Sequence, residues 1–382
     1  MLPATKSGRP SLADVLPSCL AAIFGEPNSL ALPSVDRAVV VLVDGLGVSS
    51  LRARAGHART MARELTKASV ATAGFPTTTA ANLATLTTGE PPGIHGLIGY
   101  TVLDPAHDRI VNQLTGWDDR LDPATWQRAA TVFERASDLG VPSIVVAPER
   151  YRHSGFTHAV LRGARYVSGK SIADRFAAAR QALDDVRQGI VYLYIPELDQ
   201  AAHAHGWESE KWRDALEAVD SELSRFVPML GPREGMLVTA DHGVIDVPES
   251  SHVLFGDDSA LVDGIRFVAG EPRCLQLHFE PDAGTPLRAS ILERWKAAEG
   301  GRSHVLTRRE AIEQGWFGPA VDPVVAPRIG DILVAARRAI AYYDTRAQNQ
   351  TGRNMIGQHG SFSPEESAVP LLRFGAFGLS GN

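Results

Sequence analysis

The chain has 382 residues, of which 44% are hydrophobic and 21% are charged, a composition typical of soluble proteins. Its formal net charge of -6 gives no overall basic field, so we do not expect a nucleic acid polymer as a partner. Cys19 and Cys274 stand far apart, and we find neither a secretory signal nor an apolar run long enough to span a bilayer. We therefore expect a cytoplasmic protein with no disulfide framework and no membrane partner.

The first predicted elements lead into a buried strand. Residues 1–29 form a lead-in segment in which we expect a short helix. The apolar, β-branched run at 38–43 predicts a strand buried on both faces, as in a parallel sheet. A helix is predicted over residues 49–67, followed by a short strand of small residues at 68–73.

Three threonines, Thr77, Thr78 and Thr79, stand where a loop enters a predicted helix that starts at Ala80 and ends at Gly89. Backbone N–H groups at such a place are unpaired and the helix dipole is positive, so a phosphoryl group would bind there. A threonine at this position could act as a nucleophile or could simply cap the helix. The stretch by itself favours the cap.

The rest of the chain divides into an alternating part and a mixed part. Helices alternate with apolar strands up to residue 249, which predicts an α/β fold with layered α/β/α architecture and a mostly parallel central sheet. Shorter strands and helices at 250–350 predict a smaller α+β cap insertion. Residues 30–249 and 351–382 would form the catalytic core, with a last strand within 367–374. In the core we expect strands at 141–146, 189–194 and 235–240, and helices at 130–139, 171–186 and 209–227.

Metal-type ligands occur near the ends of the core strands. They are Asp44, Asp199, His203, Asp241, His242 and His359. Ligands of open α/β sheets bind at the carboxyl ends of the strands, and carboxylate with imidazole is a ligand set of zinc. Each ligand alone could be a helix cap, a surface pair or a turn residue. Together, in this order and at these places, they favour one metal site.

The combined motifs resemble those of the alkaline phosphatase superfamily, most closely the type I phosphodiesterase/nucleotide pyrophosphatase family, over about residues 38 to 365. The resemblance is carried by Val43-Asp44-Gly45, Phe75-Pro-Thr-Thr-Thr-Ala-Ala-Asn82, Thr88-Gly89, His95-Gly96, Asp199-x-x-x-His203, Thr239-Ala-Asp-His-Gly243 and Gly357-Gln-His-Gly360. It implies that Thr79, three residues before Asn82, is the nucleophile. It also implies one metal held by Asp199, His203 and His359, a second held by Asp44, Asp241, His242 and the Thr79 oxygen, and a cap that faces the substrate.

The sequence departs from the family at one position. Nucleotide pyrophosphatases carry an asparagine that contacts the phosphoryl oxygen shortly after the His-Gly pair, and by spacing this position is Tyr100. Tyrosine can donate one hydrogen bond, so we expect Tyr100, together with Asn82, to bind substrate. Thr77 and Thr78 are expected to tolerate alanine far better than Thr79.

The resemblance implies a two-metal hydrolase of phosphodiester or nucleotide pyrophosphate bonds that forms a phospho-threonine intermediate. Zinc is the first expectation for the metal, with manganese as the alternative, and the substrate would be a small phosphate ester such as a nucleotide. A phosphonate hydrolase or phosphomonoesterase on the same metals remains an alternative. A non-catalytic binding homologue would show gaps among the ligands, and none is found. A mutase is disfavoured, because no added motif would retain a phosphoryl group.

Five further residues near the motifs have a structural and a functional interpretation. The loop around His95 favours a structural role, and His205 is expected on the surface. Trp117 and Tyr192 would line either a base pocket or the core. No arginine stands near Thr79 in the sequence, and Arg328 is a candidate to reach the phosphoryl group from elsewhere. Two dications and three aspartates leave the site at about +1, which favours diesters over monoesters.

Overall fold

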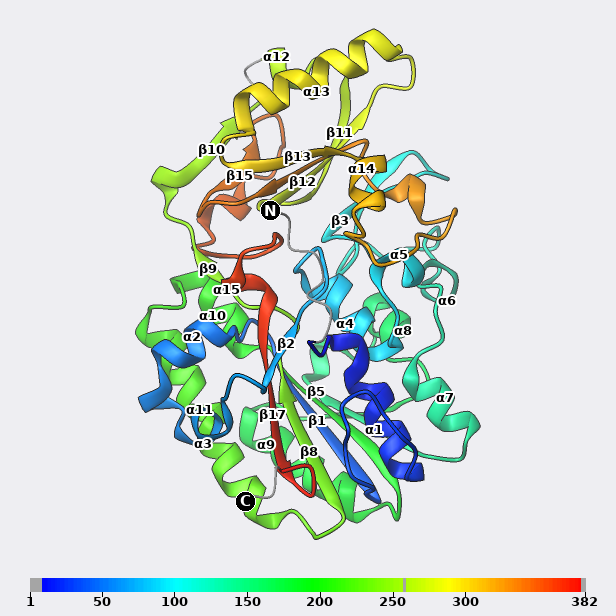
Figure 1. The fold of residues 1–382 in the computed structure, drawn as a ribbon, viewed down its shortest axis with the longest axis vertical. Helices are drawn as coiled ribbons and strands as arrows, with labels where there is room; N and C mark the ends of the chain where they lie inside the picture. Colours follow the sequence, from blue (N-terminus) through cyan, green and yellow to red (C-terminus); the bar gives the residue numbers. More distant parts are fainter. Residues whose placement is uncertain (1–8, 257–258, 379–382) are drawn as a thin grey trace.

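A seven-stranded sheet forms the lower half of the molecule in the computed structural model, and a six-stranded sheet lies in the upper half (Figure 1). The structure describes residues 9–256 and 259–378. The start of the predicted lead-in segment 1–29 and the last residues of the predicted core segment 351–382 lie outside these ranges. No helix within the described ranges has the length and apolar character needed to cross a membrane.

The seven-stranded sheet is mostly parallel, as predicted. Its strands, in spatial order, are β2 (Val70–Thr72), β17 (Ala368–Gly375), β8 (Glu234–Thr239), β1 (Arg37–Val43), β7 (Gly189–Ile195), β5 (Ser143–Ala147) and β6 (Arg165–Ser168). The strands from β8 to β6 pair in parallel, whereas β17 is antiparallel to both β8 and β2. All residues from 38 to 43 are fully buried, because β1 lies in the middle of the sheet with β7 and β8 on its two sides.

Helices cover both faces of this sheet and give the predicted α/β/α layering (Figure 1). One group packs together around β1, β5 and β7: α1 (Val15–Phe24), α4 (Thr79–Thr88), α7 (Val132–Asp138) and α8 (Gly155–Val160), with α5 (Pro92–His95) and α6 (Pro123–Trp126) at its edge. The other group comprises α2 (Val48–Ala53), α3 (Arg59–Glu64), α9 (Ile172–Asp184), α10 (Glu197–His205) and α11 (Glu210–Phe226). The parallel strands between them therefore carry apolar side chains on both faces.

The helix predicted over residues 49–67 is wrong in its length. The chain instead forms α2, a 3-10 turn at Ala55–His57 and α3. The second helix starts anew because the carboxylate of Asp220, on α11, accepts the backbone N–H groups of Thr60 and Met61 at 3.0 and 2.9 Å. A side chain from another helix thus supplies the cap, which the local sequence does not reveal.

The six-stranded sheet contains the strands expected between residues 250 and 350 and a hairpin that was not predicted. Its spatial order is β13 (Ser303–Thr307), β14 (Ile332–Ala336), β12 (Cys274–Phe279), β11 (Ile265–Glu271), β3 (Thr101–Asp104) and β4 (Arg109–Asn112). The hairpin of β3 and β4 comes from the segment between α5 and α6. The predicted cap of residues 250–350 therefore shares its sheet with a segment outside those boundaries, and its role as a separate cap stays a prediction.

Strand β14 of the six-stranded sheet is buried on both faces. Along β14, Ile332, Val334 and Ala336 pack under α13 (Thr285–Glu299), near α12 (Ser259–Val262). The alternate residues Leu333 and Ala335 belong to a second cluster, which includes Phe75 of the threonine loop, Ala84 of α4 and residues of α14 (Arg308–Glu313). This packing holds the sheet against the loop that carries the three threonines.

Two small sheets and a short helix connect the two halves. They are β10 (His252–Phe255) with β15 (Ala341–Asp344), β9 (Ile245–Asp246) with β16 (Gly357–Gln358), and α15 (Pro364–Ser367) just before β17. The pair of β9 and β16 joins the segment after Asp241-His242 to the segment before His359. The chain therefore returns from the upper sheet directly to the carboxyl end of the lower one.

Candidate active site

Thr79 is the first residue of α4, and Thr78 in the extended conformation precedes it as the cap residue without a side-chain capping bond. The Oγ1 atom of Thr79 lies 3.1 Å from Nε2 of His242, and the residue is only 8% exposed. The sequence prediction of a threonine at a helix entry is thus confirmed in its geometry. The hydroxyl faces a histidine from the segment after β8 instead of capping its own helix.

The side chain of Thr77 is hydrogen-bonded to the loop that carries His359. Its Oγ1 donates to the carbonyl of Ser361 at 2.8 Å and accepts the N–H of Gly360 at 3.0 Å. Its own carbonyl lies 2.8 Å from Nδ1 of His359. Thr77 therefore fixes the loop that carries His359, and the expectation that it tolerates alanine does not fit these contacts.

Asn82 is completely buried on the second turn of α4. Its Oδ1 accepts the N–H of Gly74 at 2.7 Å, and its Nδ2 donates to the carbonyls of Gly74 and Pro76 at 3.2 and 3.1 Å. These contacts fix the conformation of the loop before Thr79. They occupy both ends of the amide, so the predicted contact between Asn82 and substrate does not fit this position.

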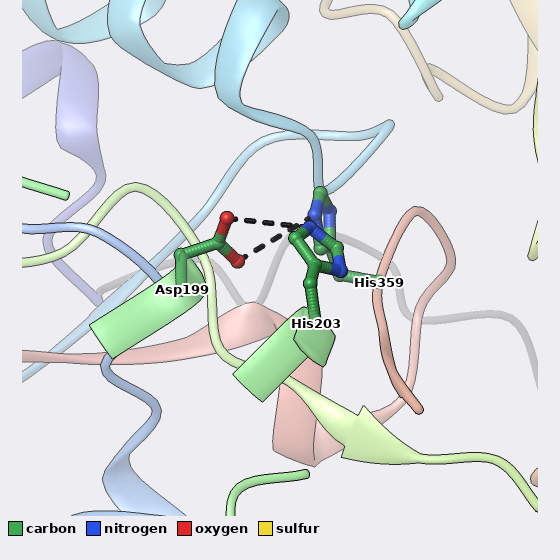
Figure 2. Close-up of side chains that lie close together, drawn as sticks. All are labelled: Asp199, His203 and His359. Atoms are coloured by element: carbon green, nitrogen blue, oxygen red, sulfur yellow. Dashed lines mark ion pairs between the residues drawn. The ribbon is translucent and has the colours of Figure 1, made fainter. Parts of the chain in front are cut away.

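Asp199, His203 and His359 form one cluster that could hold a metal ion, with ligand atoms within 4.8 Å of one another. Figure 2 shows the Asp199 carboxylate pointing toward both rings, with Oδ2 3.2 Å from Nε2 of His203 and Oδ1 3.9 Å from Nε2 of His359. Asp199 and His203 lie one turn apart on α10, which confirms the shared helix face expected from their spacing. His359 reaches them from the segment after β16.

Asp44, Asp241 and His242 form a second cluster of the same kind, and all three are buried. Asp44 follows β1, and the other two follow β8. Nε2 of His242 lies 3.5 Å from Oδ1 of Asp44 and 3.4 Å from Oδ2 of Asp241. Gly45 is needed beside Asp44, because its φ is +74° and a Cβ there would lie 3.0 Å from the Cα of Asp199.

The two clusters adjoin each other. The rings of His242 and His359 stack with their centroids 3.6 Å apart. The structure therefore brings together all six predicted ligand side chains and Thr79, in the two groups that the family resemblance implies.

Each of the three histidines is oriented by a backbone carbonyl. Nδ1 of His203 contacts the carbonyl of Gly357 at 2.8 Å, Nδ1 of His359 that of Thr77 at 2.8 Å, and Nδ1 of His242 that of Gly243 at 3.2 Å. A carbonyl only accepts, so each Nδ1 carries a proton and the Nε2 atom of each ring faces the clusters. This is the outer-shell arrangement of histidines that bind metal.

The carboxylates also offer free ligand atoms. Oδ1 of Asp44, Oδ1 of Asp199 and Oδ2 of Asp241 are buried without a hydrogen-bond partner among the described residues. A buried carboxylate oxygen that lacks a partner is costly, and a cation bound between the clusters would remove this cost. The residues present therefore fit two divalent metal ions.

Burial dominates the acid–base behaviour of the site. It raises the pKa of Asp44 well above the ordinary value, and Asp241 and Asp199 raise it further. Burial also raises the pKa of Asp241 to about 6 and lowers that of His242 to about 4 and that of His359 to about 3. Cations in the clusters would let all the carboxylates ionise together.

His203 and Asp199 behave as an ion pair. Burial opposes charge on both, but Asp199 raises the pKa of His203 to about 9, and His203 holds the pKa of Asp199 below its ordinary value. Metal binding at this cluster would therefore displace a proton from His203.

A cavity of about 670 Å³ opens beside the clusters. Its lining includes Thr79, Asp44 and Asp199, together with aromatic residues such as Trp117 and Tyr192. Tyr192 also belongs to the hydrophobic core, and a base in this cavity stays a prediction. The exposed Arg150 lies at the same cavity.

Two of the remaining predictions are confirmed and one is wrong. His95 is structural: it is fully buried, with Nε2 3.1 Å from Oγ1 of Thr85 and Nδ1 accepting the N–H of Leu97. His205 is exposed on α10. Arg328 is not available to a phosphoryl group, because it donates to the carbonyls of Gly96 and Trp126 at 2.9 Å and lies over the Trp126 ring.

Tyr100 directly precedes β3, which lies between β11 and β4 in the six-stranded sheet, and Tyr100 is 39% exposed. Its backbone N–H donates to Oε2 of Glu271 at 2.9 Å. Glu271 in turn packs on Gly360, where a Cβ would meet the Glu271 side chain at 2.3 Å. Tyr100 is thus connected to the loop of His359, and its contact with substrate stays a prediction.

Sequence reasoning missed three side chains that support the site. Tyr194 donates to Oδ2 of Asp44 at 2.5 Å, and Arg273 and Glu366 form a fully buried ion pair behind the loops of His242 and His359. In the sequence, the only signal for Tyr194 was its position at the end of the predicted strand 189–194, shortly before the candidate metal ligand Asp199. The ion pair joins residues that stand 93 positions apart, and no local pattern indicates it.

This fold is alkaline-phosphatase-like. Residues 38–362 match the model of the type I phosphodiesterase/nucleotide pyrophosphatase family, and the chain belongs to that family. The chain is 32% identical over 127 residues to a phosphopentomutase of Anaeromyxobacter dehalogenans. The aligned region covers 33% of this chain and 30% of that protein. It is 22% identical over 219 residues to ectonucleotide pyrophosphatase/phosphodiesterase 1 of Saccharomyces cerevisiae, covering 48% of this chain and 29% of that protein. The chain thus spans about a third of the length of these curated relatives.

Solved structures share the fold over nearly the whole chain. Phosphonoacetate hydrolase of Sinorhizobium meliloti 1021 has a TM-score of 0.69 at 20% identity and covers 92% of both chains. Murine ectonucleotide pyrophosphatase/phosphodiesterase 5, solved in complex with AMP, has a TM-score of 0.67 at 17% identity and covers 89% of this chain and 88% of that one. At these identities the likeness concerns the fold.

Proposed function

We propose that this protein hydrolyses phosphodiester or nucleotide pyrophosphate bonds with Thr79 as its nucleophile and two divalent metal ions, first of all Zn²⁺, as cofactors. One observation carries the proposal. The Thr79 hydroxyl lies at the start of a helix, 3.1 Å from His242, beside two clusters of three potential ligands each. Family membership supports the hydrolytic reaction class.

When bound, the two metal ions would lower the pKa of the Thr79 hydroxyl and balance the charge of the phosphoryl and departing oxygens. The deprotonated Oγ1 of Thr79 attacks phosphorus, the bond from phosphorus to the leaving oxygen breaks, and that oxygen takes up a proton. Water then attacks the phospho-threonine, the bond between phosphorus and Oγ1 breaks, and Thr79 recovers its proton. The N–H groups of the first turn of α4 face the phosphoryl oxygens in both steps.

The residues around Thr79 position it. Asn82 curves the preceding loop, and Thr77 fixes the segment of His359. We therefore assign both residues to positioning in place of the substrate contact predicted for Asn82. Tyr100 keeps its proposed contact with substrate, because its backbone is tied to that same segment through Glu271.

Metal analysis combined with an ester panel tests the proposal. The chelated protein should be inactive, and addition of zinc should restore hydrolysis of bis(p-nitrophenyl) phosphate with two metal ions per chain. His205→Ala is the matched control, because His205 is an exposed histidine on the same helix as His203. An active protein with one metal ion or none per chain would exclude the two-metal mechanism.

Phosphonate hydrolysis is the second candidate function. Arg150 lines the cavity beside Thr79 and forms no ion pair among the described residues, so it could bind a second anionic group such as a carboxylate. The same panel with phosphonoacetate decides between the two, since this substrate releases phosphate and acetate. Faster turnover of phosphonoacetate than of any diester would favour the second function.

A cytoplasmic location is part of the same proposal. Cys19 and Cys274 are both free and buried, as expected for a protein kept in a reducing compartment.

The alternative that manganese replaces zinc is tested by reconstituting the chelated protein with manganese in place of zinc.

A further inference from the structure

A further cavity, of about 720 Å³, is lined by residues of α2, β2, β17 and α15 (Figure 1). Its lining includes three cations from separate segments: Arg9 from the segment before α1, Arg52 from α2 and Lys67 from the segment before β2. No carboxylate of the described residues lines this cavity. The chain as a whole has a formal net charge of -6, so the positive lining is a local feature.

The three cations of this cavity lack a partner within the protein. Arg9, Arg52 and Lys67 are exposed, and they form no side-chain hydrogen bond or ion pair with any described residue. Arg54, close by in the sequence, instead donates to the carbonyl of Glu208 at 3.1 Å. Cations that line one cavity repel one another, and an anion bound between them would replace this repulsion by attraction.

The walls of the cavity are fixed without a ligand. β2 pairs with β17, with Val70 opposite Pro370. α2 packs closely on α15 where it starts, because a Cβ on Gly47 would lie 2.8 Å from the carbonyl oxygen of Glu365. A preformed site needs little ordering on binding beyond that of the charged side chains themselves.

The lining favours an anion with more than one phosphoryl group. Two phosphoryl groups bring about three negative charges, which balance three cations, whereas one carboxylate would leave two cations unbalanced. A guanidinium can bind two phosphate oxygens at once, and an ammonium adds a point charge. The hydroxyl of Ser49, which has no hydrogen-bond partner among the described residues, adds a donor. The concave shape favours a free anion over a flat membrane surface.

We propose that this cavity is a binding site for a small, free anion with two or more phosphoryl groups, such as inorganic pyrophosphate, held by Arg9, Arg52 and Lys67. The cavity shares no lining residue with the one beside Thr79. The site is therefore separate from the proposed catalytic site, and the inference does not depend on the proposed function.

Two double variants remove equal charge from neighbouring parts of the chain. Arg52→Gln with Lys67→Gln removes two cations of the cavity, and Arg59→Gln with Arg63→Gln is the matched control. Arg59 and Arg63 are exposed on α3, form no ion pair with any described residue and do not line the cavity. Binding of pyrophosphate to the zinc-loaded chain is measured by calorimetry, and zinc analysis of the recovered protein checks that the metal ions are retained.

The cavity variant should lose one class of pyrophosphate site, with its Kd raised about tenfold or more, whereas the Kd of the control should change less than about twofold. Any pyrophosphate bound at the metal clusters should remain in both variants. Equal weakening in both would mean that only the diffuse charge of this surface attracts the anion, and unchanged binding in both would exclude the cavity. Either result overturns the inference.

Chemical labelling of the wild-type chain locates the ligand without any substitution. At about ten times its Kd, pyrophosphate should slow acetylation of Lys67 by acetic anhydride about tenfold. Acetylation of Lys211, an exposed lysine on α11, should not change. Sedimentation with phosphatidylcholine vesicles, with and without phosphatidylserine, tests lipid headgroups as the source of the phosphoryl groups. Binding to the anionic vesicles without protection of Lys67 by pyrophosphate would assign the cations to a membrane surface and overturn the inference.

Discussion

Arg273 of the six-stranded sheet donates two hydrogen bonds to the carboxylate of Glu366, at 2.7 and 2.8 Å, and both side chains are fully buried. Glu366 also accepts the N–H of Ser361 with Oε1, at 2.9 Å, and the N–H of Gly243 with its backbone carbonyl, at 2.8 Å. Ser361 follows the loop of His359, and Gly243 follows His242. One ion pair therefore ties the upper sheet to a ligand of each candidate metal cluster.

Arg273→Met should destabilise the protein by about 3–5 kcal/mol, because it leaves the Glu366 carboxylate buried without its partner. It should also weaken zinc binding, because the loops of His242 and His359 lose their common anchor. Urea unfolding and zinc titration measure the two effects. Arg225→Met, which breaks an ion pair whose arginine side chain is 69% exposed, should change the free energy of unfolding by less than about 1 kcal/mol. Equal stability of the two variants would contradict the anchoring role.

Thr79→Ala should abolish turnover and leave the fold intact, since the one side-chain hydrogen bond of Thr79 among the described residues is that with His242. Thr77→Ala should instead cost about 1–3 kcal/mol of stability and loosen the His359 loop, because it leaves the N–H of Gly360 and the carbonyl of Ser361 without their partner. Kinetics with a p-nitrophenyl diester and thermal unfolding separate the two effects. Thr79→Ser, which keeps the hydroxyl, should retain activity. A fully active Thr79→Ala variant would refute the nucleophile assignment.

His359→Ala should empty the Asp199 cluster preferentially, and His242→Ala should empty the Asp44 cluster, because each histidine lies in only one of them. Elemental analysis should then give about one metal ion per chain for each variant, compared with two for the wild type and for the exposed control His205→Ala. Loss of both ions from either variant would mean that the stacked rings of His242 and His359 couple the two sites.

The order of elements and the ligand set could be predicted from sequence, whereas their supports could not. Apolar runs such as residues 38–43 and the offset of Asp199 to His203 are local patterns, and the structure follows them. The break between α2 and α3 depends on Asp220, which belongs to a distant helix. Similarly, the engagement of Arg328 by Gly96 and Trp126 follows from long-range packing, which a single sequence does not encode in any local pattern.

Glu271 should make stability depend on pH in a way that Glu271→Gln removes. Burial raises the pKa of Glu271 to about 8, above the unfolded value of about 4.5. The folded protein therefore holds a proton on Glu271 that the unfolded chain releases. The contribution of this protonation to the free energy of unfolding is complete below about pH 4.5 and is lost as the pH rises through about 8, at about 1.4 kcal/mol per pH unit. Melting temperatures of both proteins from pH 5 to 9 measure it. The melting temperature of Glu271→Gln should rise relative to that of the wild type as the pH rises. The melting temperature of the exposed control Glu365→Gln should differ from that of the wild type by the same amount at every pH. A constant difference between Glu271→Gln and wild type would show that Glu271 is ionised in the fold.

Diesters should be hydrolysed faster than monoesters. Two dications and the carboxylates of Asp44, Asp199 and Asp241 leave the site at about +1 before Thr79 ionises, which one phosphodiester charge balances. A monoester dianion needs a further cation near phosphorus. Arg328 cannot supply it, because its guanidinium is held by two carbonyls, whereas the exposed Arg150 lines the cavity.

The measurement that checks this charge balance is kcat/KM for bis(p-nitrophenyl) phosphate against p-nitrophenyl phosphate on the zinc-loaded protein. Arg150→Ala should lower the monoester rate more than the diester rate, because an exposed arginine contributes mainly to binding the second negative charge. Arg152→Ala is the control, since Arg152 is already paired with Glu149 and bonds the carbonyl of Tyr166. A monoester preference that survives Arg150→Ala would mean that a cation outside this cavity neutralises the phosphoryl group, and the site would then work as a phosphomonoesterase.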